Sequence, residues 1–205
     1  MLGKMLKKGI IQNQKFANDV HIDGKFNKIT ASKFDPIGGN NEDIWLKVDI
    51  IGETGPAGGI IFYDKGFKSD GWQFLECWTE DAPTTLQWKT SNSWTSPNNE
   101  WPAAIGSGYE NCYNNSGNNS SHPAIWHCTQ ATHGGYNDWF LPSKDELNEM
   151  YVNLRLKGLG HFQNEWYWSS TQFSEFNAWI QYFSTGLQNL TSKFNFFRVR
   201  AVRRF

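Results

Sequence analysis

The chain has 205 residues, a formal net charge of −1 and an aromatic content of 16%, including 11 Trp. The near-neutral charge argues against nucleic-acid binding driven by counterion release, and no segment approaches the roughly 18 apolar residues of a membrane span. This length suits one sizeable domain with an extension, and the many large rings are typical of a loop-rich fold with a small core.

The first part of the chain, residues 1–50, is expected to be an N-terminal extension or attachment segment with short strands. Residues 1–28 carry six Lys against two Asp and contain too few apolar residues for a core. They form either a flexible leader or a segment that orders on an attachment partner or in an oligomer. The dipeptide Asp23-Gly24 predicts a hairpin turn, and an alternation of apolar residues predicts a strand over 44–51.

The basic residues at the start of the chain are not followed by an apolar run of signal-peptide length. We therefore expect no secretion by that route. Localisation stays open, and association with a virion or a cell surface would then depend on a partner.

A glycine-rich turn begins the next part of the chain. Gly52, Gly55 and Gly58 resemble a phosphate-binding loop, but no strand–loop–helix context surrounds them. We therefore expect a tight turn that opens a domain. A short strand, 60–63, follows it, and residues 71–78 are the predicted partner strand of a hairpin.

The segment 79–122 is rich in Asn, Ser, Thr, Gly and Pro, which predicts a long loop region. We expect large buried rings to hold this region against the rest of the domain. The candidates are Trp88, Trp94 and Trp101.

Several potential metal ligands lie close together in the sequence: Cys112, His122, His127, Cys128 and His133. Their spacing contains no compact Cys-x₂-Cys pair, so we expect packing residues, with no metal and no cofactor. Three cysteines cannot all pair internally, and the sequence leaves open whether Cys112 and Cys128 form a disulfide.

One helix is predicted with its start defined by local sequence. Ser143 and Glu146 have the spacing of a capping box, and Gly158 is suited to terminate the helix. The apolar stripe comprises Leu147, Met150, Tyr151 and Leu154. The acidic residues of the helix, Asp145, Glu146 and Glu149, are expected to favour the positive end of the helix dipole or to face solvent.

The last stretch, 165–205, alternates residues typical of a rigid frame with residues that look unconstrained. The frame residues are Trp168, Ser169, Ser170, Ala178, Trp179, Gly186, Lys193, Arg198, Val199 and Arg200. Phe173, Phe176, Phe194 and Phe196 lie among the unconstrained residues, where polar loop residues are expected. We interpret the stretch as a frame that displays a changeable surface.

These segments together resemble a known family. The run Gly134-Gly-Tyr-Asn-Asp-Trp-Phe-Leu-Pro-Ser-Lys-Asp-Glu-Leu, followed by Tyr167-Trp-Ser-Ser-Thr and Val199-Arg-Ala-Val-Arg, is similar to the Lcl C-terminal domain family. The resemblance covers about 51–205. It implies an α+β fold of the C-type-lectin-like, formylglycine-generating-enzyme type, with short twisted strands, few helices, long inserted loops and neighbouring chain ends.

Some members of that family are variable proteins of diversity-generating retroelements, in which adenine-directed copying randomises Asn codons. An AAC codon mutated only at its adenines never yields Gln, Glu, Lys, Met or Trp. Between 172 and 197, the residues excluded in this way are Gln172, Glu175, Trp179, Gln181, Gln188 and Lys193. Phe, Leu and Ile at loop positions are all reachable, which favours a variable region of about 165–200.

The predicted function is that of a non-enzymatic protein whose variable surface recognises a receptor or another exposed ligand. The predicted ligand-binding residues are Phe173, Ser174, Phe176, Asn177, Ile180, Tyr182, Ser184, Leu187, Asn189, Leu190, Ser192, Phe194, Asn195 and Phe196. Phe197 belongs either to the core or to this surface. The alternatives are a carbohydrate-binding lectin and a structural adhesin or appendage subunit.

Overall fold

The computed structural model describes residues 10–11, 29–32, 44–48, 50–90, 100–115 and 119–205. The chain divides into two compact units, Met1–Glu53 and Thr54–Phe205. The break falls three residues after residue 50, where the sequence suggests the end of the extension.

The first unit contains a small antiparallel sheet. Its strands are β1 (Ile10–Ile11), β2 (Ile29–Ser32) and β3 (Ile44–Val48), with β3 in the middle. The strand predicted over 44–51 is confirmed as β3. The hairpin predicted at Asp23-Gly24 lies outside the described residues.

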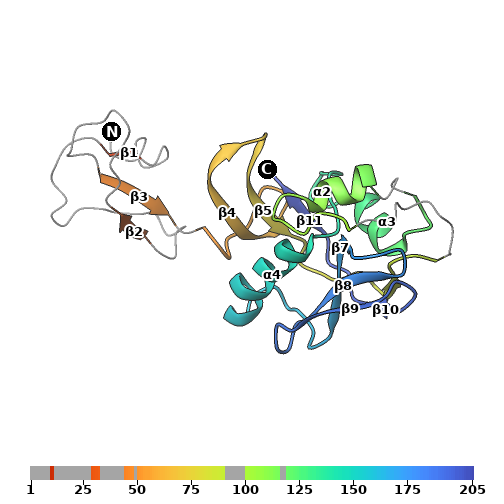
Figure 1. The fold of residues 1–205 in the computed structure, drawn as a ribbon. Helices are drawn as coiled ribbons and strands as arrows, with labels where there is room; N and C mark the ends of the chain where they lie inside the picture. Colours follow the sequence, from red (N-terminus) through yellow and green to blue (C-terminus); the bar gives the residue numbers. More distant parts are fainter. Residues whose placement is uncertain (1–9, 12–28, 33–43, 49, 91–99, 116–118) are drawn as a thin grey trace. The chain divides into compact units, whose positions relative to one another are not determined.

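The second unit is α+β with few helices, as predicted (Figure 1). Its strands are β4 (Ile60–Ser69), β5 (Trp72–Cys77), β6 (Leu86–Gln87), β7 (Trp166–Gln172), β8 (Asn177–Tyr182), β9 (Gln188–Ser192), β10 (Phe196–Phe197) and β11 (Val202–Arg204). Its helical segments are α2 (Gly108–Glu110), the π-helical η1 (Asn111–Asn115), α3 (Pro123–Thr129), α4 (Lys144–Asn153) and the 3₁₀ turn η2 (Arg155–Lys157). No helix among the described residues has the length and apolarity needed to cross a membrane.

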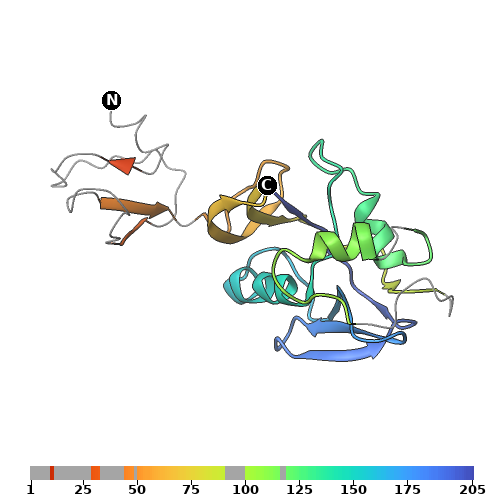
Figure 2. The ribbon, with the colours of Figure 1, turned by 45° about the horizontal axis from the view of Figure 1, so that its top comes forward.

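Two three-stranded antiparallel sheets organise this unit. One has the order β11-β5-β4, so strands from the two ends of the unit flank β5. The other has the order β7-β8-β9 and carries the predicted variable region. Helix α4 packs against β4, β7 and β8, and therefore bridges the two sheets (Figure 2).

The glycine turn before β4 forms as predicted, because it closes around a buried carboxylate. A Cβ atom at Gly55 would lie 2.2 Å from Glu76 Oε2, so only glycine fits there. Glu76 is fully buried and accepts hydrogen bonds from Gly59 N at 3.1 Å and from Arg203 Nη1 at 2.9 Å. The hairpin that follows is confirmed, although β4 continues to Ser69 rather than ending at Tyr63.

Large rings fill the core, as the composition indicates. Trp88, Trp101, Trp139 and Trp168 are each at most 2% exposed. Trp88 Nε1 donates a hydrogen bond to Ser169 O at 2.9 Å, and Trp101 N donates to Gln172 O at 3.0 Å, so these two residues hold the long loop region against β7 as predicted. Trp94 lies outside the described residues.

The long loop region contains helical turns that the sequence does not predict. Helix α2 runs directly into η1, where buried Asn111 donates hydrogen bonds to Pro102 O at 2.8 Å and to Ser170 Oγ at 3.3 Å. These partners lie elsewhere in the chain. Tertiary contacts therefore stabilise the turn where local helix propensity is low.

The Cys residues and His122 are buried in the core, and His127 and His133 are partly buried. Cys77, Cys112 and Cys128 are buried thiols, and no disulfide joins Cys112 to Cys128. His122 lies edge-on to Trp88 with centroids 5.2 Å apart, and His133 stacks on Trp78 at 4.2 Å. Within the described ranges, no three His, Cys, Asp or Glu residues are grouped as metal ligands.

Helix α4 begins at the predicted capping box. Glu146 does not face solvent, and its contacts extend beyond the helix start. Its carboxylate is fully buried and accepts hydrogen bonds from Ser143 N at 2.6 Å, Gly106 N at 2.8 Å and Gly108 N at 3.4 Å. Burial raises the pKa of Glu146 to about 7, although these N–H donors act to lower it. The expectation of a solvated face is wrong here, because the loop 104–108 closes over the helix start.

The Glu146 contacts yield a first prediction. Glu146→Gln places an amide N–H₂ among N–H donors, so the variant should lose about 1–3 kcal/mol of unfolding free energy at pH 8. Urea denaturation measures this loss. Glu149→Gln, on the same helix but only partly buried, should cost about 0.5 kcal/mol or less. Equal losses in the two variants would contradict the role given to the buried carboxylate.

Candidate functional site

The strands β7, β8 and β9 and the loops that join them hold most of the predicted binding residues, and β8 is covered on both faces. On one face Ile180 pairs with Trp168, which is fully buried. On the other face Gln181 donates a hydrogen bond to Asn148 Oδ1 of α4 at 2.9 Å. The exposed positions of the predicted set lie in the loops, in β9 and in β10, whereas Asn177 and Tyr182 of β8 are half-buried.

The loops of this sheet lie at its two ends. The β7–β8 loop (173–176) and the β9–β10 turn (193–195) lie at the same end, since Lys193 N donates to Phe176 O at 2.9 Å. The β8–β9 loop (183–187) lies at the opposite end and carries Leu187. We call Phe173, Phe176, Phe194 and Phe196 the aromatic surface, since the first two belong to the β7–β8 loop and the others to the β9–β10 turn or the residues just after it.

The aromatic surface is largely open to solvent. The exposed fractions are 43% for Phe173, 53% for Phe176 and 60% for Phe196, whereas Phe194 is half-buried. Exposure at the other predicted positions divides into two groups. Ser184, Leu187, Asn189 and Asn195 are exposed, while Ser174, Asn177, Tyr182, Leu190 and Ser192 are half-buried.

Ile180 is a correction to the predicted set. It is only 4% exposed and belongs to the core, because it lies on the face of β8 that packs against Trp168. Phe197, which the sequence leaves open, packs edge-on against Trp168 with centroids 5.1 Å apart. It therefore supports the frame. Tyr182 stacks on Trp166 at 5.0 Å and keeps its outer side accessible.

Lys193 holds the two neighbouring loops together. Its backbone N donates to Phe176 O, and its backbone O accepts from Trp88 N at 3.0 Å and Lys89 N at 3.1 Å. Its side chain is fully buried, with Nζ 4.2 Å from the centroid of the Trp88 ring and a short hydrogen bond to Gln172 Oε1. One residue therefore links β7, the β7–β8 loop and the segment after β6.

Burial lowers the pKa of Lys193 to about 7, and the neighbouring charge of Lys89 acts in the same direction. Glu175, in the β7–β8 loop, acts to raise it. The cost of burying this ammonium group is offset in part by the face of the Trp88 ring and by the amide oxygen of Gln172.

Five of the six residues that adenine mutation of AAC cannot produce make contacts within the frame; the sixth, Glu175, is a half-buried residue of the β7–β8 loop. Gln172 and Lys193 bond to each other, and the ring of Trp179 lies 4.1 Å from Lys144 Nζ of α4. Gln188 donates to Lys144 O at 3.1 Å, and Gln181 donates to Asn148. Codon reachability and structural role therefore divide the region in a similar way, with two exceptions: Ile180 is reachable but buried, and Glu175 is unreachable but lies in a loop.

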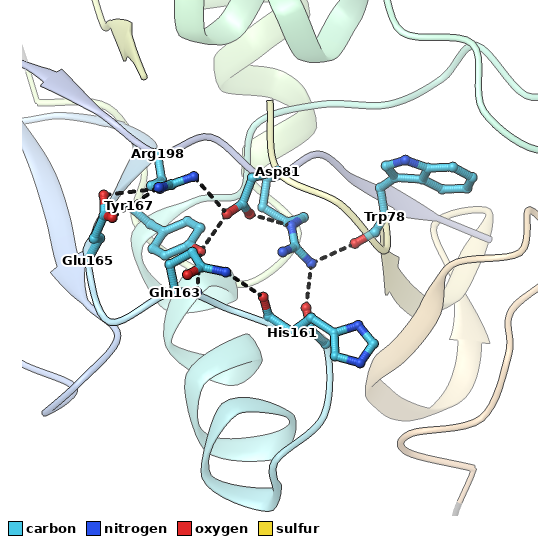
Figure 3. Close-up of polar contacts among 9 residues, drawn as sticks. Trp78, Asp81, His161, Gln163, Glu165, Tyr167 and Arg198 are labelled. Carbon is cyan, nitrogen blue, oxygen red and sulfur yellow. Dashed lines mark hydrogen bonds and ion pairs between the residues drawn. The ribbon is translucent and has the colours of Figure 1, made fainter. Parts of the chain in front are cut away.

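A second network joins this sheet to the segment after β5 (Figure 3). Asp81 accepts hydrogen bonds from Tyr167 Oη at 2.7 Å and from Arg200 Nε at 2.7 Å. Arg200 Nη1 also donates to Trp78 O and Gly160 O, both at 2.9 Å. Arg198 lies beside this group and binds Glu165 with two hydrogen bonds of 2.9 and 3.1 Å.

Sequence reasoning missed Asp81 as a frame residue. It lies in a stretch of mixed polar residues with no recognisable pattern, more than 80 residues before its partners. The signal for Asp81 is the closing Arg-Val-Arg motif, because buried arginines require an acidic partner elsewhere in the chain.

The model of the Lcl C-terminal domain matches residues 78–203. The chain belongs to this family. The match begins later than the expected residue 51, yet it includes the Lys193 contacts, the Asp81 network and the whole β7-β8-β9 sheet of the Lcl C-terminal domain. No curated protein matches the chain significantly.

A second prediction concerns Lys193 in this Lcl C-terminal domain. Its folded pKa of about 7 is lower than its ordinary value of 10.5, so the unfolded chain binds more protons above pH 7. The contribution of Lys193 to stability is therefore lowest below pH 7 and increases as the pH rises through it. Relative to Lys193→Met, the wild type should gain unfolding free energy between pH 6.5 and 8.5, by at most about 1.4 kcal/mol per pH unit.

Chemical denaturation of both proteins across this pH range measures the difference. Lys157→Met is the matched control, since Lys157 is exposed in η2. A wild-type gain that is the same relative to both variants would contradict a buried, readily deprotonated Lys193.

Proposed function

We propose that the chain is a non-enzymatic binding protein whose aromatic surface recognises an exposed protein ligand, on a frame of the C-type-lectin-like type. The observation that carries the proposal is the pairing of three exposed phenylalanines with loops fixed at one end of a buried frame. Membership of the Lcl C-terminal domain family supports a binding role in general terms.

The energetics support recognition through these rings. Burial of one phenylalanine against a partner contributes roughly 2–3 kcal/mol. Several such rings offset a good part of an association cost of about 4–15 kcal/mol. Because Lys193 holds the two loops together, little further ordering is required on binding. Aromatic anchors on a fixed support are typical of binding hot spots.

A third prediction tests this surface. The full chain with Phe173, Phe176 and Phe196 all changed to Ser should bind its protein ligands at least about 100-fold more weakly, because three apolar anchors are lost. Labelled protein applied to a protein array and a glycan array in parallel identifies the ligand class, and titration of the strongest features gives the affinities.

Phe67→Ser is the matched control, since Phe67 is 69% exposed on β4, outside the aromatic surface. It should leave binding unchanged. Protein binding that survives the triple change would contradict the proposal. Binding confined to glycans would establish the lectin alternative, and a stable oligomer that buries the three phenylalanines would establish the structural-subunit alternative.

We further propose that adenine-directed copying diversifies the region 165–200. The division between reachable, accessible residues and unreachable, frame-contacting residues supports this proposal.

A fourth prediction follows for the gene. The DNA near the codons for 165–205 should contain a near-copy that differs from them only where the copy has adenine. Sequencing of the locus and of several isolates checks it. A second copy with differences spread over all four bases, or isolates identical in this region, would exclude this diversification mechanism while leaving the binding role intact.

A further inference from the structure

The edges of the two larger sheets in the second unit are protected with one exception. The outer side of β7 pairs with Arg198, whose O accepts from Trp168 N at 3.0 Å and whose N donates to Trp166 O at 3.0 Å. The outer side of β11 forms an antiparallel bridge with Phe140, in which Val202 and Phe140 exchange two backbone hydrogen bonds. The edge strand β4 contains register shifts and the charged residues Asp64, Lys65 and Lys68. Such features prevent unwanted strand pairing.

Strand β9 has none of these protections among the described residues. Its sequence, Gln188-Asn-Leu-Thr-Ser192, contains no charge and no proline. Its register with β8 is continuous from Gln188 to Ser192. It ends the sheet order β7-β8-β9, and the β8–β9 hairpin runs along one border of the domain in Figure 2.

The hydrogen-bond pattern shows which backbone groups face outward. Tyr182 N donates to Leu187 O at 2.8 Å, and Lys193 N donates to Phe176 O at 2.9 Å. Because antiparallel pairs alternate, the odd-numbered residues of β9 bond to β8. The N–H and C=O groups of Gln188, Leu190 and Ser192 therefore point away from the sheet.

Two of these outward groups have local partners only. Leu190 N donates to the exposed Asn189 side chain at 2.8 Å, and Ser192 O accepts from Asn195 N at 3.0 Å. The backbone N–H and C=O of Gln188 also point outward, and no residue that the structure describes forms a hydrogen bond with them. A strand placed beside β9 would satisfy these groups and would displace the Asn189 carboxamide.

We propose that β9 pairs with an extended, uncharged segment of the protein ligand, which adds a fourth strand to the sheet. This inference rests on the proposed function and assigns the mode of binding. Main-chain hydrogen bonds supply affinity that does not depend on side chains, so this part of the interface persists when the neighbouring residues change. Exposed Leu187, at 58%, and the aromatic surface flank the two ends of β9 and select the side chains of the added strand.

A second copy of the chain is a less suitable occupant of this edge. If two β9 strands paired about a two-fold axis, any substitution in β9 would occur twice in the interface. A ligand strand meets each of them once, so binding tolerates diversification better.

The experiment uses the full chain and a random dodecapeptide library displayed on phage. Selected peptides are synthesised, and their affinities are measured by fluorescence anisotropy. Leu190→Pro removes the outward N–H without removing a bond to β8, and proline is accepted in edge strands. Leu190→Ser is the matched control, because it removes the same apolar side chain and keeps the N–H. The proline variant should bind roughly three- to tenfold more weakly than the serine variant.

A scan of N-methyl groups along the best peptide gives a second readout on the unaltered protein. Methylation at alternate peptide residues should weaken binding, and methylation at the residues between them should not. A uniform response along the peptide, or proline and serine variants of equal affinity, overturns strand addition. If strand addition fails in this way but the triple phenylalanine variant still loses binding, the proposed function stands and only the mode of binding is wrong. A library without binders, or a chain that pairs through β9 with itself on sizing, also overturns the inference.

Discussion

The buried ammonium group of Lys193 is the contact on which the candidate binding surface depends. The side chain lies on the face of Trp88, and the backbone of the same residue bonds to segments that are far apart in the sequence. Because the β7–β8 loop and the β9–β10 turn meet at this residue, their separation is set by the core and not by the residues they expose. Changes in the exposed side chains therefore leave the support unchanged.

A second constraint acts near the start of β7, whereas Lys193 bonds to Gln172 at its end. Asp81 neutralises Arg200 at a site where both side chains are almost completely removed from water. Loss of one partner of a buried ion pair costs about 3–5 kcal/mol, because the other charge remains buried. Tyr167, fully buried in β7, bonds to the same carboxylate, so this strand is held by the Asp81 network as well as by its neighbours in the sheet. The rigidity of the surface therefore comes from polar contacts in the interior as well as from packing.

Features that depend on local sequence were predicted well. The capping box at Ser143, the glycine turn before β4 and its hairpin follow from residues only a few positions apart. Accessibility along the last stretch was predicted for Phe173, Phe176 and Phe196, since their apolar character was out of place in loops.

The errors have a common physical cause, which is contact with distant segments. Glu146 is buried by a loop about 40 residues earlier in the chain, so its own helix gives no indication of this. Codon reachability places Ile180 on the surface, but it lies in a central strand covered on both faces and is therefore in the core. The helical turns of 108–115 depend on Asn111 reaching Pro102 and Ser170, which no local propensity reveals.

The sheet β11-β5-β4 determines where this unit can be joined to other domains. Phe205 O accepts from Gln73 N at 2.7 Å, and Ile60, near the other end of the unit, pairs with Cys77 on the same strand β5. Both ends of the unit therefore meet at one sheet, and in Figures 1 and 2 this sheet lies apart from β8, β9 and β10. Neighbouring ends of this kind favour circular permutation and domain insertion. A domain fused after Phe205 would therefore join the unit at this sheet and not at the loops that carry the aromatic surface.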